Sequence, residues 1–248
     1  MTSPKQPGMY KRVLLKISGE SLAESQGDIK SGILCQNTLR RLASEIASLV
    51  SQGIQICIVV GGGNIIRGSK LTKELDIDRS TADTMGMLAT VINALAMQQV
   101  IEASGIPCRV LTGLQMTSVA EPFVQRKALR HLEKGRVVIF ASGTGNPYFT
   151  TDTAAALRAL EMNCDALLKA TNVDGVYDKD PQKHKDATFI SETTYTEALN
   201  QNLQVMDAAA FGLLRDYKIP LIVFSIHKDN ALIDVVHSRG IFTIIKPT

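Results

Sequence analysis

The sequence predicts an α/β protein, a three-layer αβα sandwich in which helices cover both faces of a mostly parallel central sheet. Short runs of β-branched and apolar residues, such as 55–60 and 136–140, recur along the chain and are typical of buried strands. Segments with helical periodicity separate these runs, and this alternation favours a parallel sheet. In 248 residues we find no linker rich in Pro, Gly or Ser. We therefore expect a single domain over residues 11–248, preceded by a flexible tail of residues 1–10.

The predicted strands share Val, Ile and Leu interiors bounded by turn-forming residues. In chain order they are 11–17, 55–60, 108–111, 136–140, 166–171, 221–224 and 241–245. Two of these strands carry a lysine near their end, Lys16 and Lys169. A lysine in that position either extends into solvent or faces an anion. The strand pattern by itself leaves both interpretations open.

The predicted helices have apolar residues at intervals of three or four and polar residues at their starts. They cover 36–51, 84–104, 123–133, 153–162, 195–200 and 206–216. The first ends before Gly53. Helix 84–104 is apolar nearly all round, which indicates a second subunit against it as well as the core. Asp83 is expected to be its N-cap, and Thr151 or Asp152 that of helix 153–162. The charged segment 71–80 is expected to be mobile.

Composition and residue spacing exclude several classes of function. A formal charge of +3 is too small to indicate nucleic-acid binding. Nothing approaches 18 consecutive apolar residues, so we expect no membrane span. The four cysteines and four histidines are scattered without the spacing of metal ligands. We therefore predict free thiols in a reducing cytoplasm and no metal held by the protein alone.

The segment 141–152 is the most informative part of the chain. It follows a predicted strand and leads into a helix, the position at which open α/β sheets bind ligands. Two glycines allow a ligand close to the backbone, and free N–H groups at a helix start suit anions. The side chains of Thr144, Asn146, Thr150 and Thr151 add donors and acceptors. An ordinary strand-to-helix turn is the alternative interpretation.

A second glycine-rich loop, 61–64, follows strand 55–60. Three consecutive glycines cost conformational entropy, and close approach of the backbone to a ligand would explain them. Residues 68–70 read Gly-Ser-Lys, which inverts the P-loop order, and the third glycine of the dinucleotide motif is missing. Arg67 follows the glycines and either grips a phosphate or extends into solvent.

Four loops, 18–21, 61–64, 143–152 and 172–181, gather at one edge if the sheet is mainly parallel. Together they supply two lysines, an arginine, many backbone N–H groups and a carboxylate. We find no Ser-His-Asp set, reactive cysteine or Gly-x-Ser-x-Gly motif. Because phosphoryl transfer depends mainly on positioning and charge compensation, these residues favour a kinase.

Five motifs resemble those of the bacterial UMP kinases, a family of the amino acid kinase superfamily. They are Lys-Ile-Ser-Gly-Glu at 16–20, Gly-Gly-Gly-Asn at 61–64, Met-Gly-Met-Leu-Ala-Thr at 85–90, Gly-Thr-Gly-Asn-Pro-Tyr-Phe-Thr-Thr-Asp at 143–152, and Lys-Ala-Thr-Asn-Val-Asp-Gly-Val-Tyr at 169–177. The third and fourth are specific to the uridylate branch. The resemblance implies the amino acid kinase fold, with an N-terminal acceptor half and a C-terminal ATP half. It also implies phosphorylation of UMP by ATP, giving UDP and ADP, in the synthesis of UTP and CTP.

The resemblance also implies residue roles. Lys16 and Lys169 would stabilise charge on the transferred phosphoryl group, Asp152 would orient them, and Asp207 would be a structural carboxylate nearby. Residues implied for UMP, with Asp83 at the ribose and Arg67 near the phosphate, are Gly62, Arg67, Asp83, Thr144, Gly145, Asn146, Pro147, Tyr148, Phe149, Thr150 and Thr151. Residues implied for ATP, which would bring Mg²⁺, are Lys16, Ser18, Gly19, Gly63, Thr171, Tyr177 and Asp180.

The same resemblance implies a cytoplasmic homohexamer inhibited by UTP, with no nucleic-acid or membrane partner. Residues 24–29 depart from the glycine-rich stretch with an aromatic residue that the family associates with GTP activation, so GTP activation is not carried over. A sister kinase acting on a carboxylate or carbamate would share the chemistry and differ at Asp83 and 143–151. A non-catalytic UTP sensor would be expected to lose Lys16, Lys169 and Asp152, yet all three are present.

Overall fold

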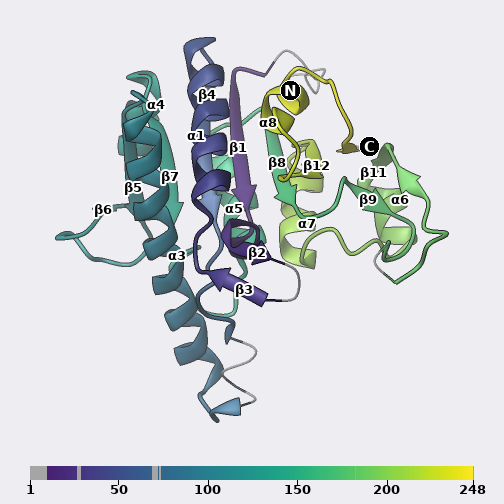
Figure 1. Ribbon diagram of the computed structural model, residues 1–248, viewed down its shortest axis with the longest axis horizontal. Coiled ribbons are helices and arrows are strands. Elements are labelled where there is room, and N and C mark those ends of the chain that lie inside the picture. The colour runs from purple at the N-terminus through teal and green to yellow at the C-terminus, as the bar shows by residue number, and fades with distance from the viewer. Residues whose placement is uncertain (1–9, 27–28, 69–71, 73, 182, 248) are drawn as a thin grey trace.

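A nine-stranded sheet forms the centre of the molecule, seen in a computed structural model that describes residues 10–26, 29–68, 72, 74–181 and 183–247 (Figure 1). Within these residues the strand order is β11-β13-β12-β8-β1-β4-β7-β5-β6. Every neighbouring pair is parallel except β12 and β13, which confirms the mostly parallel sheet. The strands are β1 Arg12–Ile17, β4 Gln55–Val60, β5 Cys108–Thr112, β6 Glu121–Pro122, β7 Val137–Ala141, β8 Ala166–Thr171, β11 Glu192–Thr194, β12 Leu221–Ser225 and β13 Thr243–Lys246.

Helices cover both faces of this sheet, and Figure 1 shows α1 over one face with α5 behind the other. The first face packs against α1 Gln36–Ser51, α3 Arg79–Ala103 and α8 Ala231–Val236. The second packs against α4 Gln125–Glu133, α5 Thr151–Glu161, α6 Tyr195–Asn200 and α7 Ala208–Asp216. The predicted three-layer arrangement is therefore confirmed.

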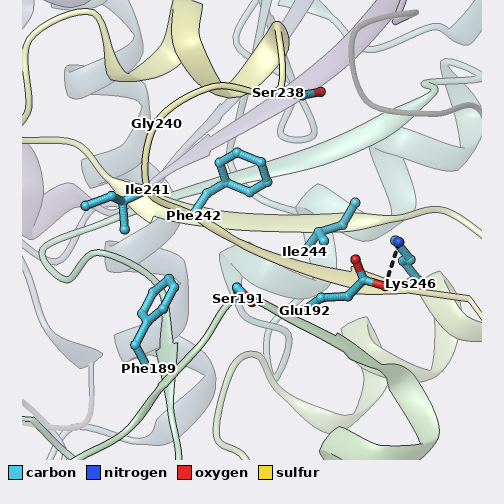
Figure 2. Close-up of a pocket in the computed structure, with 9 residues that line it drawn as sticks. All are labelled: Phe189, Ser191, Glu192, Ser238, Gly240, Ile241, Phe242, Ile244 and Lys246. Carbon is cyan, nitrogen blue, oxygen red and sulfur yellow. Dashed lines mark ion pairs between the residues drawn. The ribbon is translucent and has the colours of Figure 1, made fainter.

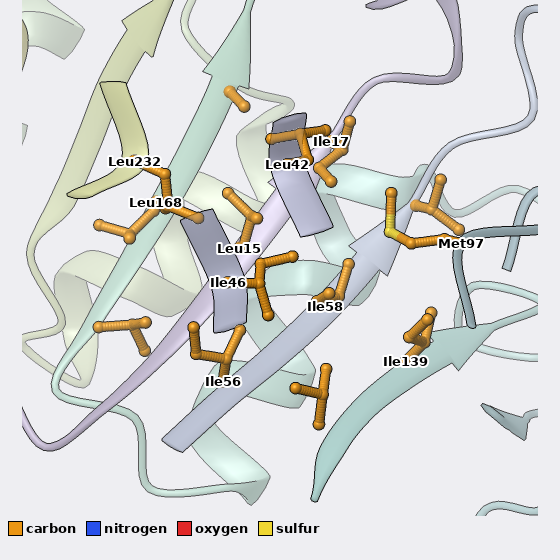
Figure 3. Packing of buried hydrophobic residues seen from close by; sticks show 14 of the residues in the cluster. Leu15, Ile17, Leu42, Ile46, Ile56, Ile58, Met97, Ile139, Leu168 and Leu232 are labelled. Carbon is orange, nitrogen blue, oxygen red and sulfur yellow. The ribbon is translucent and has the colours of Figure 1, made fainter. Parts of the chain in front are cut away.

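Alternation along the strands divides the core into two apolar clusters. In β1, Leu15 and Ile17 point to the first face while Leu14 points to the second, because successive strand side chains point to opposite sides. Figure 3 shows the first cluster, in which Leu42 and Ile46 of α1 lie over the strands. All three β1 side chains are fully buried. Burial on both faces explains why the strands are continuous apolar runs.

Two hairpins lie outside the main sheet and were not predicted. The first pairs β2 Glu24–Gln26 with β3 Ile29–Gly32. Residues 24–29, which depart from the family's glycine-rich stretch, fall in this hairpin, although residues 27 and 28 lie outside the described part. The second pairs β9 Val176–Tyr177 with β10 Phe189–Ile190. Thr243 fixes the second hairpin to β13, since its hydroxyl accepts from Val176 N at 2.8 Å and donates to Ile190 O.

Two helices begin earlier in the sequence than predicted. Helix α3 begins at Arg79, because Asp78 rather than Asp83 is its N-cap and accepts from Thr81 N at 3.0 Å. Helix α5 begins at Thr151, because the hydroxyl of Thr150 accepts the first backbone N–H groups. In both cases the chosen cap lies N-terminal to the predicted one, since more than one polar residue precedes each apolar run.

Helix α3 is apolar enough to cross a membrane by length and composition alone. Its Ala94, Met97 and Ile101 are buried in the core cluster, so it is packed as a core helix. Leu88 and Ile92 on the same helix are 46% and 53% exposed. The half nearer Arg79 extends past the carboxyl edge of the sheet (Figure 1).

Two expectations concern segments that the structure describes only in part. Residues 1–9 of the predicted tail lie outside the described residues, whereas Tyr10 is buried in the core. In the predicted mobile segment 71–80, residues 71 and 73 lie outside the described part, and Arg79 and Ser80 belong to α3. None of the four cysteines, all of which are described, forms a disulfide.

Candidate active site

The loops after β1 and β4 interlock through their glycines. A Cβ atom added to Gly19 would lie 2.6 Å from Gly63 N and 2.8 Å from Gly61 O, closer than such contacts allow. A Cβ on Gly62 would lie 2.9 Å from Ala89 Cβ of α3. These glycines are therefore required for packing of backbone against backbone and helix, and not only for access of a ligand.

Lys16 and Lys169 lie side by side in the sheet, since β1 and β8 pair in parallel with these two residues in register. Both ammonium groups contact the carboxylate of Asp152 at the start of α5. Lys16 Nζ lies 2.7 Å from Asp152 Oδ1, and Lys169 Nζ lies 2.8 Å from Asp152 Oδ2. The three side chains are 8%, 13% and 15% exposed, in the order Lys16, Lys169, Asp152. We call this group the Lys-Asp-Lys cluster.

Burial and mutual charge set the protonation of the cluster. Burial acts to raise the pKa of Asp152, but the charges of Lys16 and Lys169 outweigh it and hold that pKa below its ordinary value. Burial, together with the charge of Lys16, lowers the pKa of Lys169 despite the opposing effect of Asp152. The carboxylate is therefore ionised, and it keeps two neighbouring ammonium groups together against their repulsion.

A second carboxylate, Asp207, fixes the start of α5. The hydroxyl of Thr153 donates to both oxygens of Asp207 at 2.9 Å, and the hydroxyl of Thr150 donates to Oδ2. Asp207 is also the N-cap of α7, accepting from Ala210 N at 2.9 Å. Asp207 therefore ties α5 to α7 and holds the turn that presents Asp152.

Asp83 anchors the loop between β7 and α5 rather than capping a helix. Its Oδ2 accepts from Tyr148 N at 2.8 Å, at a residue in the left-handed region with φ 71°. Arg79, one helical turn away, donates from Nε to both carboxylate oxygens at 2.9 and 2.8 Å. Arg67 forms an ion pair with Glu20 and is half exposed.

Two cavities lie next to the Lys-Asp-Lys cluster. The smaller, of about 200 Å³, lies between the start of α3 and the loop before α5. Its lining includes Gly62, Gly63, Asp83, Thr144, Asn146, Phe149, Thr150 and Thr151. The larger, of about 590 Å³, lies beside the β9 hairpin, and its lining includes Lys169, Thr171, Tyr177 and Asp180. Lys169 lines the larger cavity and Asp152 follows Thr151 of the smaller, so the cluster lies between them.

Not every predicted site residue lines a cavity. Among the described residues, Lys16, Ser18, Gly19, Arg67, Gly145, Pro147, Tyr148 and Asp152 lie outside both linings. Gly63, predicted on the ATP side, lines the smaller cavity instead. Gly145 and Gly113 are in backbone contact, since a Cβ on Gly145 would lie 2.8 Å from Gly113 O.

Sequence reasoning missed several participants. Arg79 holds Asp83, and the backbone carbonyl of Val205 accepts from Lys169 Nζ. Every residue has a backbone carbonyl, so nothing in the sequence distinguishes Val205 as an acceptor, and only the fold identifies it. Arg79 lies four residues before Asp83, a spacing typical of helical ion pairs. That signal was hidden because the helix was expected to begin after it.

A further cavity, of about 400 Å³, lies between β10 and β13, near the β11 edge of the sheet (Figure 2). Phe189, Ile241 and Phe242 contribute to its lining, and a Glu192–Lys246 ion pair of 2.6 Å closes one side. None of the predicted site residues lines it. It is therefore separate from the Lys-Asp-Lys cluster.

A parallel sheet with two lysines at adjacent strand ends, bridged by a helix-start aspartate between two cavities, is suited to phosphoryl transfer. The chain belongs to the amino acid kinase family, whose model matches residues 11–225.

The chain is also similar to individual proteins of known name. The chain is 53% identical to the uridylate kinase of Paramagnetospirillum magneticum over 236 residues, 95% of this chain and 96% of the relative. It is 51% identical to the uridylate kinase of Methylococcus capsulatus over 245 residues, 99% of each. Among solved structures, UMP kinase from Ureaplasma parvum matches with a TM-score of 0.89 and 41% identity, over 95% of this chain and 98% of that chain. UMP kinase from Bacillus anthracis matches with a TM-score of 0.89 and 40% identity, over 96% of each.

Proposed function

We propose that this chain transfers the γ-phosphoryl group of ATP to UMP, giving UDP and ADP. The names of relatives about half identical over the full length support this activity. The observation that carries it is the Lys-Asp-Lys cluster, which lies between two cavities at the carboxyl edge of the sheet. Two bound nucleotides would meet at that position.

The chemistry requires charge compensation rather than a general base. The second pKa of a phosphate monoester is about 6, so the phosphate of UMP is already a nucleophile at neutral pH. An attack by one polyanion on another is opposed chiefly by repulsion. Two ammonium groups in a site with little water oppose that repulsion most strongly where charge develops on the transferred group. Lys16 and Lys169 are in position to do this.

The proposed division of one domain into an N-terminal acceptor half and a C-terminal ATP half would give each substrate its own cavity. UMP would occupy the smaller cavity, with Asp83 of its lining at the ribose hydroxyls. Arg67, which lies outside that lining and pairs with Glu20, would leave Glu20 to lie near the phosphate. ATP would occupy the larger cavity, beside Thr171, Tyr177 and Asp180, with its phosphates directed toward the loop that carries Ser18 and Gly19.

Mg²⁺ would come with the ATP. In the described part of the chain, no three His, Cys, Asp or Glu side chains gather as a metal site, and both oxygens of Asp152 face lysines. This donor set fits an ion held mainly by phosphate oxygens and water, the usual arrangement for Mg²⁺. Bound there, the ion would supply positive charge that offsets the charge of the triphosphate.

Removal of the Asp83 carboxylate is expected to weaken UMP binding. The change Asp83→Ala deletes both the proposed ribose contact and the anchor of Tyr148 N. Hydrogen bonds to charged groups contribute about 1.5–3 kcal/mol, so the KM for UMP should rise about 10- to 100-fold. The KM for ATP should change by less than about twofold. Steady-state kinetics with each substrate varied in turn measures both.

The variant Asp83→Asn provides the matched control, because its amide oxygen still accepts from Tyr148 N. We expect it to raise the KM for UMP less than Asp83→Ala does. An unchanged KM for UMP in both variants would remove the role proposed for Asp83.

The acceptor can be tested directly by coupled ADP release with Mg-ATP and a panel of UMP, CMP, dTMP, AMP, glutamate and carbamate. We expect turnover confined to UMP. Turnover with glutamate or carbamate would keep the family assignment and make the proposed acceptor residues wrong. Absence of turnover with every acceptor, together with tight UTP binding, would support a regulatory sensor instead.

We further propose a cytoplasmic homohexamer inhibited by UTP, acting in the synthesis of UTP and CTP without a nucleic-acid or membrane partner. The exposed Leu88 and Ile92 on α3 support contact between subunits, because a helix that is apolar on both sides is normally covered on both. Binding of UTP at a site distinct from both substrate cavities would make this inhibition allosteric.

A further inference from the structure

A chain of hydrogen bonds crosses the ends of three adjacent strands, β1, β8 and β12. The residues involved are Ser18 and Ser21 after β1, Asn172 after β8 and His227 after β12. Asn172 Oδ1 accepts from Ser21 Oγ at 2.7 Å and lies 3.1 Å from His227 Nε2. Ser18 Oγ and Ser21 Oγ lie 2.7 Å apart. Of these four residues only Ser18 has been placed in the reaction so far.

The donor in each of these hydrogen bonds can be assigned, and the bonds converge on the amide oxygen of Asn172 from both sides. An amide oxygen only accepts, so the imidazole of His227 donates from Nε2. Because the Ser21 hydroxyl donates to Asn172, the Ser18 hydroxyl must donate to Ser21. Ser18 Oγ also accepts from Ser21 N at 3.2 Å, as the N-cap of the 3₁₀ turn η1 Gly19–Leu22. Both bonds together hold the turn that carries Ser18 and Gly19.

The loop that carries His227 is itself fixed from α1. Arg41 donates to the carbonyl oxygens of Ile226 and Lys228. Glu45, which is 3% exposed, accepts from Leu232 N at 2.9 Å with its Oε2. Lys228 Nζ also contacts Asp174 Oδ1 at 2.8 Å, beside the His227–Asn172 contact. His227 is therefore held from α1 and from the loop after β8.

Protonation of the imidazole does not interrupt the chain. Burial, followed by the charge of Arg41, lowers the pKa of His227. Since Nε2 carries a proton in the charged form as well, the donor to Asn172 is present in both forms. The contact therefore acts as a fixed structural link and not as a pH-dependent switch.

We propose that His227 is a positioning residue for phosphoryl transfer, which acts through Asn172 and Ser21 to orient the Ser18–Gly19 turn toward the phosphates of ATP. This inference rests on the proposed function, because that function places ATP phosphates at the turn. The link joins the end of the ATP half to the first loop of the acceptor half. The substrate affected is the nucleoside triphosphate, while the UMP cavity is formed by other loops.

The test compares three variants in steady-state kinetics. His227→Ala should raise the KM for Mg-ATP about 5- to 10-fold, the effect of about one hydrogen bond, with the KM for UMP changed by less than about twofold. His227→Gln, whose amide can donate in place of Nε2–H, should restore most of the loss. His237→Ala is the matched control and should behave as the unaltered protein.

His237 suits this purpose because its Nε2 lies 2.9 Å from Gln52 Oε1, the same kind of imidazole–amide contact. Gln52 directly follows α1 and precedes β4, at the opposite edge of the sheet from the site. The two alanine variants therefore each lose one imidazole–amide contact, but only the contact of His227 is linked to Ser18.

A second comparison separates positioning from general stability. Ser21→Ala interrupts the same chain from the other side and should raise the KM for Mg-ATP to a similar degree. Combined with His227→Ala, it should add little further, since residues that act as one unit are not additive. Effects that multiply, or an unchanged KM in both single variants, would overturn the inference. If His227→Ala does not fold, Ser21→Ala and His227→Gln still decide it.

Failure of the proposed function would look different. The unaltered protein and His237→Ala would then both lack turnover with UMP. Calorimetric binding of Mg-ATP would decide the inference in that case, with weaker binding expected for His227→Ala and equal binding contradicting it.

Discussion

Replacement of Asp152 by Asn is expected to lower turnover about 100- to 1000-fold, the usual effect of removing one preorganised electrostatic group from an active site. The carboxylate forms ion pairs with Lys16 Nζ at 2.7 Å and with Lys169 Nζ at 2.8 Å. Without its charge the two ammonium groups repel each other, and the pKa of Lys169, already lowered by burial, should fall further. Lys16→Ala should cause a comparable loss by removing one of the two charges directly.

The pH dependence gives this prediction a specific check. If deprotonation of Lys169 contributes to the loss in Asp152→Asn, turnover should recover toward lower pH relative to the unaltered protein. Circular dichroism establishes that the fold is retained. Asp216→Asn, which changes an exposed carboxylate paired with Arg215, is the control and should keep full activity. Turnover near that of the unaltered protein in both Asp152→Asn and Lys16→Ala would contradict the mechanism.

Gly19→Ala is expected to damage both stability and use of ATP. The added methyl group would lie 2.6 Å from Gly63 N and 2.8 Å from Gly61 O, and backbone atoms cannot move aside as a flexible side chain can. Overpacking of this kind costs about 1–3 kcal/mol of unfolding free energy. Separation of the two glycine loops should also move the proposed phosphate site, so the KM for ATP should rise about 10-fold or more.

Gly212→Ala adds the same methyl group elsewhere. Apart from its chain neighbours and the backbone of its own helix, no heavy atom of the described chain lies within 4 Å of the new Cβ, and Gly212 lies inside α7. Alanine in a helix interior is more stable than glycine by about 0.5–1 kcal/mol, so this variant should gain stability and keep its kinetics. Chemical denaturation and ATP kinetics measure both variants. A Gly19→Ala protein with unchanged midpoint and unchanged KM would show that the loops can separate without consequence.

Local patterns determined the elements that are long or buried on two faces. Helix α1 at Gln36–Ser51, strand β4 at Gln55–Val60 and strand β8 at Ala166–Thr171 were predicted with their observed bounds. Periodicity is strong there because each residue's environment repeats along the element. Helix α8 at Ala231–Val236 was missed, since it is short and its first turn is stabilised by Glu45, which lies far away in the sequence.

For the site, the sequence by itself determined which residue types lie at the strand ends and, through the five motifs, which chemistry they favour. Only the tertiary structure decided what each group contacts. It brings Lys16, Asp152 and Lys169 together from two strands and a helix, and it uses Asp83 to hold Tyr148 rather than to cap α3. It also shows that the backbones at Gly19 and Gly61 pack too closely for a side chain at Gly19. The reason is physical: these hydrogen-bond partners and packing neighbours belong to different strands, helices and loops. They leave no periodic pattern in either local segment, so the contacts exist only once the sheet has aligned its strand ends.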